Sequence, residues 1–323
     1  MSQAPNSTPK LTPDFTQLSS ARSDTGVLVP DRAHWKAEGA LAMVALVWGA
    51  TFVVVKQALP HISTVYFLSV RFWLASLCML ALFVRPFHRA GAARVVAGLR
   101  GGVIAGVFLW LGYTLQTFGL KYTTAGKSGF LTGLYIALVP LLAAARYRRW
   151  PQTSELIGVG LAVVGMAFLT LPSISPGGFR LNRGDTLTIL CAVAFAIHLL
   201  LLGHFAQRAM VEAVALGQIA CAAALSTLLL AAEPPRADWS FSVLFAIGLT
   251  SVFATALAFT VQTWGQRHTT ATRTALIFAL EPVFALAAAA MWGREALTWN
   301  ALAGGALILG GILFVELKPT GVR

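Results

Sequence analysis

Charged residues are scarce in this chain: Asp, Glu, Lys and Arg together make up 11% of its 323 residues. Soluble globular domains typically carry about 25%, so the composition excludes an ordinary water-soluble enzyme or binding domain. Cysteine is also rare, and its three copies, Cys78, Cys191 and Cys221, all lie within apolar runs. A fold stabilised by disulfides is therefore not expected.

The chain also lacks the short motifs of enzymes that work in membranes or on ATP. It contains no H-E-x-x-H, G-x-S-x-G or G-x-G-D run. The tetrapeptide AGKS at Ala125–Ser128 resembles the end of a phosphate-binding loop, but Lys121 stands where such a loop has its first glycine. We therefore expect no enzymatic activity, no ATP, no cofactor and no metal.

Apolar residues are abundant instead, at 57%, and they come in runs of about twenty. A helix of that length crosses a hydrocarbon layer of about 30 Å. The sequence therefore predicts an all-α integral membrane protein with ten transmembrane helices. The predicted spans are 38–58, 63–84, 98–119, 123–145, 153–172, 185–204, 211–232, 240–264, 270–292 and 298–317.

The segments outside these spans are short and polar. Residues 1–37 are rich in Ser, Thr, Pro and Asp and have no apolar stretch after a basic start. They are predicted to be a disordered cytoplasmic tail and not a signal peptide. Residues 173–184 are predicted to connect two five-helix units, 38–172 and 185–317, and residues 318–323 to form a second cytoplasmic tail.

The net charge of +12 predicts an orientation in the membrane. The basic residues are scattered over short connections and form no stripe, so a nucleic-acid partner is not expected. If the N-terminus is cytoplasmic, sixteen Lys and Arg residues lie on the cytoplasmic side and six on the other. Cytoplasmic loops are enriched in Lys and Arg, so both termini are predicted to be cytoplasmic in an inner or plasma membrane.

One phrase occurs twice in the chain. LQTFGLKYTTAGKSGFLTGL begins at Leu115 and VQTWGQRHTTATRTALIFAL begins at Val261, 146 positions later. Glycines keep the same spacing, since Gly158 matches Gly304 and Gly165 matches Gly311. Each copy would hold five spans, and an odd number inverts the second copy in the membrane. Inverted repeats are typical of secondary transporters.

Several stretches resemble EamA-type members of the drug/metabolite transporter superfamily. They are LVWGATFVVVKQALP (Leu46–Pro60), SVRFWLA with Arg71, GDTLTILCAVAFAIHLLL (Gly184–Leu201) and the stretch from Ala279 to Leu313 that begins ALEPVFALAAAAMWGRE. The resemblance covers about residues 38–317. It implies two inverted five-helix domains around a central cavity and the movement of small metabolites, often outward.

The chain departs from part of that superfamily at its first helix. Small multidrug relatives use a glutamate there for proton exchange. The stretch LAMVALVWGATFVVVK contains no acid, so that mechanism cannot be carried over at this position.

Four ionisable residues fall well inside the predicted spans, where a charge is costly unless it faces a cavity or a partner. Glu281 can bind a substrate ammonium, exchange a proton, or simply lock helices through an ion pair. Arg71 can grip a carboxylate, pair with Glu281, or bind backbone carbonyls. Lys56 is close enough to a helix end to reach water. His198 is a proton-relay candidate or a hydrogen-bonded packing residue.

Uncharged residues complete the set of site candidates. Gln116 and Gln262 face each other in the repeat and either line the cavity or cap the Thr-Thr turn. Aromatic residues either wall the cavity or anchor the membrane interface; these are Trp48, Tyr113 and Tyr135.

Two prolines and two glycine-rich runs predict how the helices bend and pack. Pro140 and Pro282 are expected to break their helices and to free the carbonyls of Ile136 and Phe278. Pro140 would align with residue 286, so the two breaks are expected about one turn out of register. The glycine-rich runs at 101–112 and 302–313 are predicted to be close helix contacts.

The predicted function is secondary transport, most simply export, of small polar metabolites such as amino acids by alternating access. The expected partners are a small-molecule substrate and the lipid bilayer, with the chain acting as a monomer or homodimer. The alternatives are an intramembrane enzyme and a non-transporting membrane scaffold or sensor.

Overall fold

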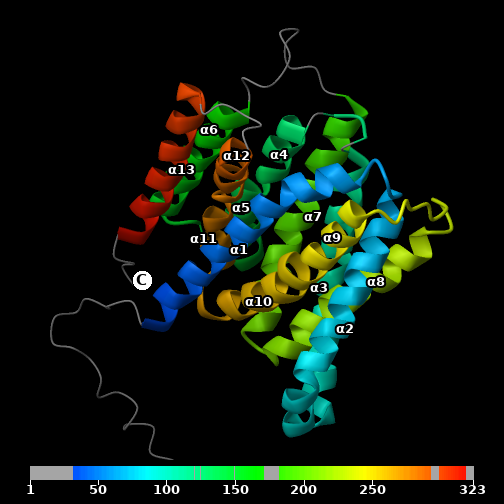
Figure 1. Ribbon diagram of the computed structural model, residues 1–323. Coiled ribbons are helices and arrows are strands. Elements are labelled where there is room, and N and C mark those ends of the chain that lie inside the picture. The colour runs from blue at the N-terminus through cyan, green and yellow to red at the C-terminus, as the bar shows by residue number, and fades with distance from the viewer. Residues whose placement is uncertain are drawn as a thin grey trace, which may run out of the picture. The chain divides into compact units, whose positions relative to one another are not determined.

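The computed structural model describes residues 32–119, 121–123, 125–148, 150–170, 182–291 and 298–317. Every regular element within these ranges is a helix (Figure 1), and the paired extended backbone there is limited to one isolated bridge between Ile62 and Ala237. The helices are α1 (Arg32–Ala58), α2 (Thr64–Ala90), α3 (Ala92–Gly119), α4 (Ala125–Gly133), α5 (Tyr135–Tyr147), α6 (Thr153–Thr170), α7 (Arg183–Ala206), α8 (Val211–Leu229), α9 (Phe241–Ser251), a π-helix (Val252–Leu257), α10 (Ala258–His268), α11 (Ala271–Phe278), α12 (Glu281–Met291) and α13 (Trp299–Leu317).

Helices occupy all ten of the predicted spans, as far as these ranges describe them. Six stretches are long and apolar enough to cross a membrane: α2, α3, 128–147, α7, α8 and 241–268. The multi-pass membrane protein is thereby confirmed, and the count of ten crossings stays a prediction. Helix α1 begins at Arg32, inside the predicted tail, while residues 1–31, 173–181 and 318–323 lie outside the described residues.

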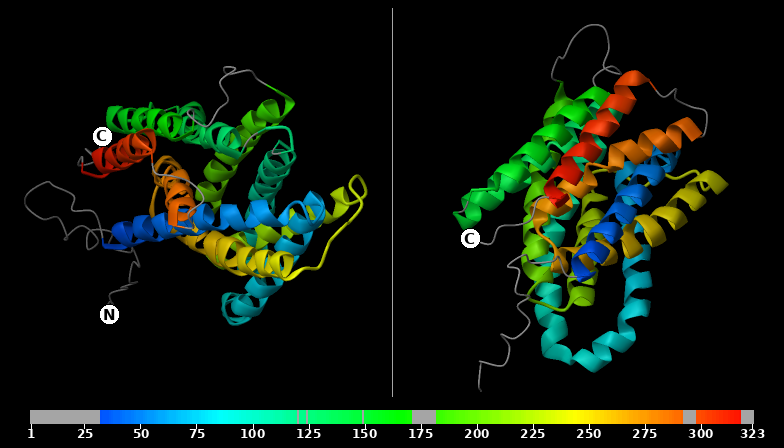
Figure 2. Two further views of the ribbon diagram at one scale, coloured as in Figure 1. Left: turned by 45° about the horizontal axis from the view of Figure 1, so that its top comes forward. Right: turned by 90° about the vertical axis from the view of Figure 1, so that its left-hand side faces the viewer.

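Helices α6 and α13 lie side by side (Figure 2) and cross at glycines, as the sequence predicted. A Cβ added to Gly165 would lie 2.6 Å from the carbonyl oxygen of Gly304, and one added to Gly311 would lie 2.7 Å from that of Gly158. Small residues of this kind let two backbones approach closely. The two contacts are reciprocal: replacing Gly165 and Gly304 by their repeat partners, Gly311 and Gly158, turns the first contact into the second, as in a two-fold interface.

Glycines also bring α3 against α8, the second crossing that the sequence predicted. A Cβ on Gly102 would lie 2.4 Å from the carbonyl oxygen of Val214, and one on Gly217 would lie 2.7 Å from that of Leu99. Helix α2 joins α3 in a hairpin that turns at Gly91, whose φ of 81° is one that glycine adopts readily. The cavity described below is therefore held on one side by a tightly packed helix pair.

Two breaks interrupt helices that would otherwise cross the bundle. The first lies at Leu134, between α4 and α5, and the second at residues 279–280, between α11 and α12. The backbone N–H of Leu134 donates to Leu131 O, and that of Leu280 donates to Ile277 O, so both turns tighten to i→i−3 bonds. Corresponding residues of the two breaks are 146 positions apart.

The predicted position of the first break was wrong. Pro140 lies inside α5, six residues after the break, and Pro282 is the second residue of α12. The N–H groups of the first helical turn have no acceptor within the helix. A proline in that turn, such as Pro282, therefore removes no helical hydrogen bond. The two breaks therefore occupy equivalent positions in the repeat, although the two prolines do not. The predicted offset of one turn between the breaks was wrong.

Polar contacts tie together the connections at the end of the bundle where α1 finishes, called here the Leu59 end. The N–H of Ser63 donates to Arg236 O at 2.8 Å, and Lys121 Nζ lies 2.6 Å from Glu233 Oε1. Glu233 Oε2 accepts from the N–H of Val65 at 2.9 Å. Burial alone would raise the pKa of Glu233, but these hydrogen bonds and the Lys121 charge outweigh it and lower that pKa.

The glycine crossing predicts a selective loss of stability. Gly304→Ala places a Cβ 2.5 Å from Gly165 O, so we expect it to lower the free energy of unfolding in mild detergent by about 1–3 kcal/mol. Gly310→Ala on the same helix is the control, since its Cβ meets nothing within 4 Å. Equal stabilities of the two variants would contradict this account of the crossing.

The clamp at Glu233 predicts a pH-dependent contribution to stability. Because its folded-state pKa is lowered, the contribution is complete above the unfolded pKa of about 4.5 and is lost as pH falls through the folded pKa. We expect Glu233→Gln to have a lower melting temperature than the parent at pH 7, with the difference shrinking below pH 4.5. A difference that stays constant from pH 7 to pH 3 would exclude the ionised clamp.

Candidate functional site

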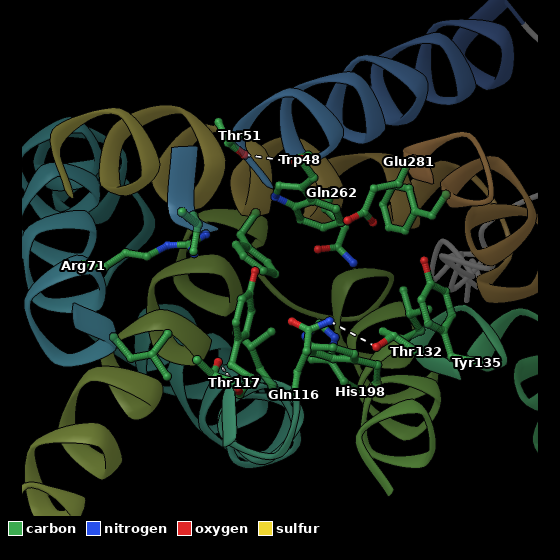
Figure 3. A pocket seen from close by; sticks show the side chains of 18 of the residues that line it. Trp48, Thr51, Arg71, Gln116, Thr117, Thr132, Tyr135, His198, Gln262 and Glu281 are labelled. Carbon is green, nitrogen blue, oxygen red and sulfur yellow. Dashed lines mark hydrogen bonds between the residues drawn. The ribbon is translucent and has the colours of Figure 1, made fainter. Parts of the chain in front are cut away.

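A cavity of about 140 Å³ lies among the helices where both breaks occur (Figure 3). Engineered cavities of about 150 Å³ bind benzene, so the space suits a solute of roughly that size. Its walls come from α1, α2, α3, α4, α5, α7, α10, α11 and α12. The breaks deliver Tyr135 and Glu281, the first residues of α5 and α12, to this space. Irregular backbone is tolerated at membrane depth where it lines such a cavity.

Aromatic rings form much of the wall. The ring of Trp48 lies 5.0 Å from that of Phe278 and 5.3 Å from that of Phe259. Tyr113 meets Phe195 edge-on at 5.5 Å. These geometries are the favourable ones for aromatic pairs. Trp48, Tyr113 and Tyr135, for which the sequence left two roles open, all line the cavity.

Arg71 enters the cavity wall from α2 and is only 5% exposed. Its Nε donates to Thr255 Oγ1 at 2.7 Å, and one terminal nitrogen donates to Ala254 O at 3.4 Å. The guanidinium also lies 5.2 Å from the ring centroid of Tyr113, a cation–π distance. No carboxylate among the described residues pairs with it. Neutral groups hold the side chain in place and leave its charge uncompensated.

The π-helix supplies both of these partners, and no pattern in the sequence indicated it. Ala254 and Thr255 lie within Val252–Leu257, and Ala254 O also accepts from Trp48 Nε1 at 2.8 Å. Single π-turns inside α-helices occur frequently at functional sites. The Ala254 carbonyl of the π-helix thus holds both Trp48 and Arg71 in place.

Glu281 is the acid of the cavity lining, and its carboxylate points into the space. It forms no ion pair or hydrogen bond with the described residues. Figure 3 places Arg71 and Glu281 on opposite sides of the cavity. They share one space without touching, so the alternative in which Arg71 neutralises Glu281 directly is not what the structure shows. Gly49 of α1 packs on this turn, with a Cβ there 2.6 Å from Glu281 O.

Both predicted glutamines also line the cavity. Gln116 Nε2 donates to Thr132 Oγ1 at 3.2 Å, whereas Gln262 is 1% exposed and its Oε1 has no hydrogen-bond partner. A buried acceptor without a partner is rare in native proteins. Four pairs of lining residues are 146 positions apart: Tyr113 and Phe259, Gln116 and Gln262, Thr132 and Phe278, and Tyr135 and Glu281.

His198 has both a place on the wall and a structural partner. Its Nε2 lies 2.8 Å from Gln218 Oε1, which can only accept, so this nitrogen carries the proton. Gln218 Nε2 donates to Thr263 Oγ1, and the Thr263 hydroxyl donates to Phe259 O. The chain of bonds ends on the backbone and holds the ring in one orientation. A proton-relay role for His198 stays a prediction.

The remaining predicted residues either lie outside the cavity lining or have side chains that the structure does not describe. Lys56 belongs to α1, but its side chain is outside the part of the chain that the structure describes. Pro282 follows Glu281 directly, while Pro140 does not line the cavity. Sequence reasoning missed Thr51, Thr132, Phe195 and Phe259, because threonine and phenylalanine in an apolar run carry no signal that separates wall from core.

These features describe a helical membrane protein with an internal cavity lined by both charges and by aromatic rings. The model of the EamA-like transporter family matches the chain twice, over residues 35–171 and 182–317. The chain therefore belongs to that family, as its sequence resemblance implied.

Individual relatives agree with this assignment. A protein of Archaeoglobus fulgidus named as an uncharacterized transporter is 33% identical over 86% of this chain and 85% of its own. A probable amino-acid metabolite efflux pump of Salmonella typhimurium is 27% identical over 88% and 96%. A solved structure titled only as the crystal structure of a protein is similar in fold, with a TM-score of 0.73 at 18% identity over 88% of this chain and 98% of the other.

The His198–Gln218 bond predicts a measurable coupling. Gln218→Leu leaves the buried imidazole N–H without an acceptor, so we expect it to lower the free energy of unfolding by about 1–3 kcal/mol. His198→Phe combined with Gln218→Leu should cost less than the sum of the two single changes, by at least about 0.5 kcal/mol. Denaturant titration in detergent measures all four proteins, and simple additivity would show that the bond contributes nothing.

Proposed function

We propose that this protein is a secondary transporter for small zwitterionic metabolites, with amino acids as the first class to test. The observation that carries the proposal is the pair Arg71 and Glu281, two opposite charges on the wall of one cavity. Neither has an ionic partner among the described residues. Charges inside a membrane are expensive and mark substrate or ion pathways.

A zwitterionic cargo compensates both charges at once. Its carboxylate would bind the Arg71 guanidinium, which its bonds to Thr255 and Ala254 already orient. Its ammonium would bind the Glu281 carboxylate and the unpartnered Gln262 Oε1, both of which accept. A single positive or negative solute would leave one of the two charges uncompensated, which favours zwitterions over simple anions or cations.

The aromatic wall favours a cargo with a small apolar or aromatic side chain. Trp48, Tyr113 and Phe259 all line the cavity, and the ring of Phe259 contacts those of the other two. Burying apolar surface contributes about 25 cal/mol per Å², so side-chain size sets affinity while the charges set orientation. The volume of about 140 Å³ argues against peptides or large drugs.

We further propose ten crossings in two inverted five-helix repeats, with both termini cytoplasmic. Three spacings of 146 support the repeat: the matched helix breaks, the matched cavity residues, and the reciprocal glycine contact between α6 and α13. The double match of the family model agrees with it. Alternating access then moves one five-helix unit against the other around a fixed cavity.

Export is the proposed direction, driven by the proton gradient or by the cargo's own gradient. A relative named as a probable amino-acid metabolite efflux pump supports this choice. Glu281 is the acid of the cavity lining and is therefore the first residue to test for a proton exchanged for cargo. The chain is proposed to act as a monomer or homodimer, with the lipid bilayer and the small-molecule substrate as its partners.

The experiment is counterflow of labelled amino acids into liposomes that contain the purified protein. We expect uptake by the parent protein, with Glu281→Gln and Arg71→Gln each lowering the initial rate roughly tenfold to hundredfold, since each removes a charged hydrogen bond of about 1.5–3 kcal/mol. Asp238→Asn is the control, because this acid is 81% exposed and lies outside the cavity.

Other outcomes point elsewhere. Counterflow that survives both cavity variants would keep the transporter and remove the charge pair as its site. Counterflow that a pH gradient accelerates in the parent, but not in Glu281→Gln, would identify proton coupling at that residue. Absence of counterflow for any tested cargo would return attention to an intramembrane enzyme or a non-transporting scaffold.

A further inference from the structure

Buried polar atoms without partners continue from the cavity along one face of α10. They are Gln262 Oε1, Gln266 Oε1 and Thr269 Oγ1, on residues that are at most 5% exposed. Gln262 and Gln266 are four residues apart and lie on one side of α10, and Thr269 follows as its C-cap residue, with extended backbone. Gln266 Nε2 donates to Leu199 O at 3.1 Å, which fixes the amide so that its oxygen is the free atom. We call these three residues the α10 polar row.

The row leads away from the accessible end of the cavity. Val55, Leu59 and Gln116, toward the Leu59 end, are partly exposed lining residues, whereas Gln262, His198 and Phe278 are at most 2% exposed. His268, the last residue of α10, lies beside His34 near the start of α1, at the opposite end of the bundle. The row therefore runs from the closed side of the cavity toward that end.

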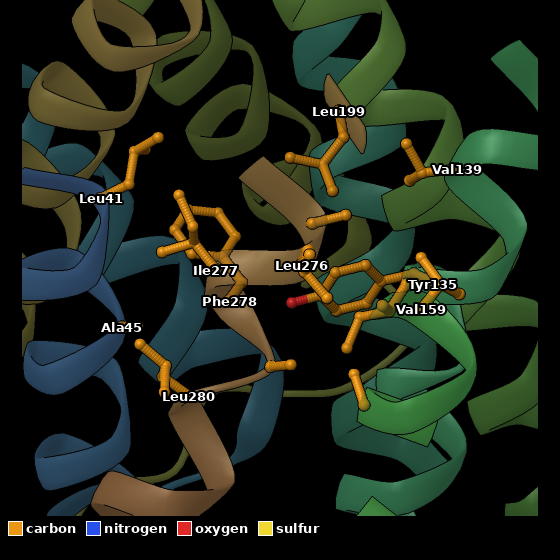
Figure 4. Close-up of a cluster of buried hydrophobic side chains, with 14 of the residues drawn as sticks. Leu41, Ala45, Tyr135, Val139, Val159, Leu199, Leu276, Ile277, Phe278 and Leu280 are labelled. Carbon is orange, nitrogen blue, oxygen red and sulfur yellow. The ribbon is translucent and has the colours of Figure 1, made fainter. Parts of the chain in front are cut away.

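Apolar side chains pack closely around α10 near the row. Leu41 of α1, Leu199 of α7, and Leu276 and Ile277 of α11 belong to one buried cluster (Figure 4). Leu41 packs onto α10 at Gly265, where an added Cβ would lie 2.9 Å from Leu41. Three helices thus meet near polar atoms that have no hydrogen-bond partner among the described residues. Such an arrangement is unfavourable for a permanent core.

Ionic contacts fasten the same end of the bundle. Glu38 Oε1 of α1 lies 3.2 Å from Arg273 Nη1 of α11 and 2.7 Å from His34 Nε2, and Arg273 Nη1 also contacts His34 Nε2. Glu38 is 7% exposed, and its Oε2 is buried without a hydrogen bond. We call the Glu38–Arg273 pair the latch. It holds the first turns of α1 to the start of α11, next to the end of α10.

We infer that the α10 polar row lines the second half of the cargo's route, shut here by the apolar cluster and by the latch. The row offers oxygen acceptors, so it suits the cargo's ammonium group and the water that follows it. When the latch breaks, α1 and α11 separate, the seal at Leu41 opens, and the three oxygens gain partners from water. This inference rests on the transporter proposed above and assigns residues to its closed side.

The test measures access to the row directly. Gln266→Cys and Thr269→Cys are introduced separately, with and without Arg273→Gln, and labelled in membrane vesicles with a charged methanethiosulfonate reagent added on the α1 N-terminal side. Peptide mass spectrometry separates their labelling from that of Cys78, Cys191 and Cys221. Ala246→Cys on α9 is the control, because Ala246 is equally buried and lies off the row.

We expect Arg273→Gln to raise the labelling rate at positions 266 and 269 at least tenfold and to leave position 246 unchanged. The charge-reversed pair, Glu38→Arg with Arg273→Glu, should return labelling to the slow rate. This rescue separates loss of the ion pair from misfolding of Arg273→Gln. Unchanged labelling at 266 and 269, or an equal rise at 246, would overturn the inference.

The labelling result is independent of the cargo. Absence of counterflow in the parent protein would count against the proposed function, whatever the labelling shows. Unchanged labelling in a parent that transports would count against the assigned route alone.

Discussion

The need to satisfy every backbone N–H and C=O without water governs this molecule. In hydrocarbon, continuous helices and closed barrels meet that need, so this helical chain can depart from helix only where a cavity or packed protein receives the freed groups. It departs at Leu134, at residues 279–280 and in the π-helix at Val252–Leu257. The two breaks adjoin cavity-lining residues, and the π-helix holds the lining residues Arg71 and Trp48 through Ala254 and Thr255. The irregular backbone and the site are consequently one feature.

The treatment of Arg71 shows how a fold can keep a charge available. Direct pairing with Glu281 would have satisfied both groups and left nothing for a ligand. The guanidinium instead bonds to a hydroxyl and a carbonyl and lies near the ring of Tyr113. These neutral contacts orient the group without cancelling its charge. Glu281 lies apart from Arg71 on the same cavity wall. The distance between these two groups sets the length that a bound zwitterion must span.

Much of the fold and part of the site could be predicted from the sequence. The apolar runs located the helices because their length is set by the membrane, and the repeat located the glycine crossings. Arg71, Glu281 and Gln262 stood out because polar residues are costly in such runs. The π-helix could not be predicted, since it depends on how Arg71 and Trp48 meet Ala254. The first break could not be placed from Pro140, because this proline lies inside α5, six residues after the break, and does not mark it.

The match between Tyr135 and Glu281 has a consequence for recognition. These residues occupy equivalent places after equivalent helix breaks, yet one is a phenol and the other an acid. A wall with identical residues at both places would receive an elongated solute equally well in either of two poses related by a half-turn. Because Tyr135 and Glu281 differ chemically, the two poses differ in energy. The two ends of the cavity are therefore chemically different, so that an elongated solute binds preferentially in one orientation.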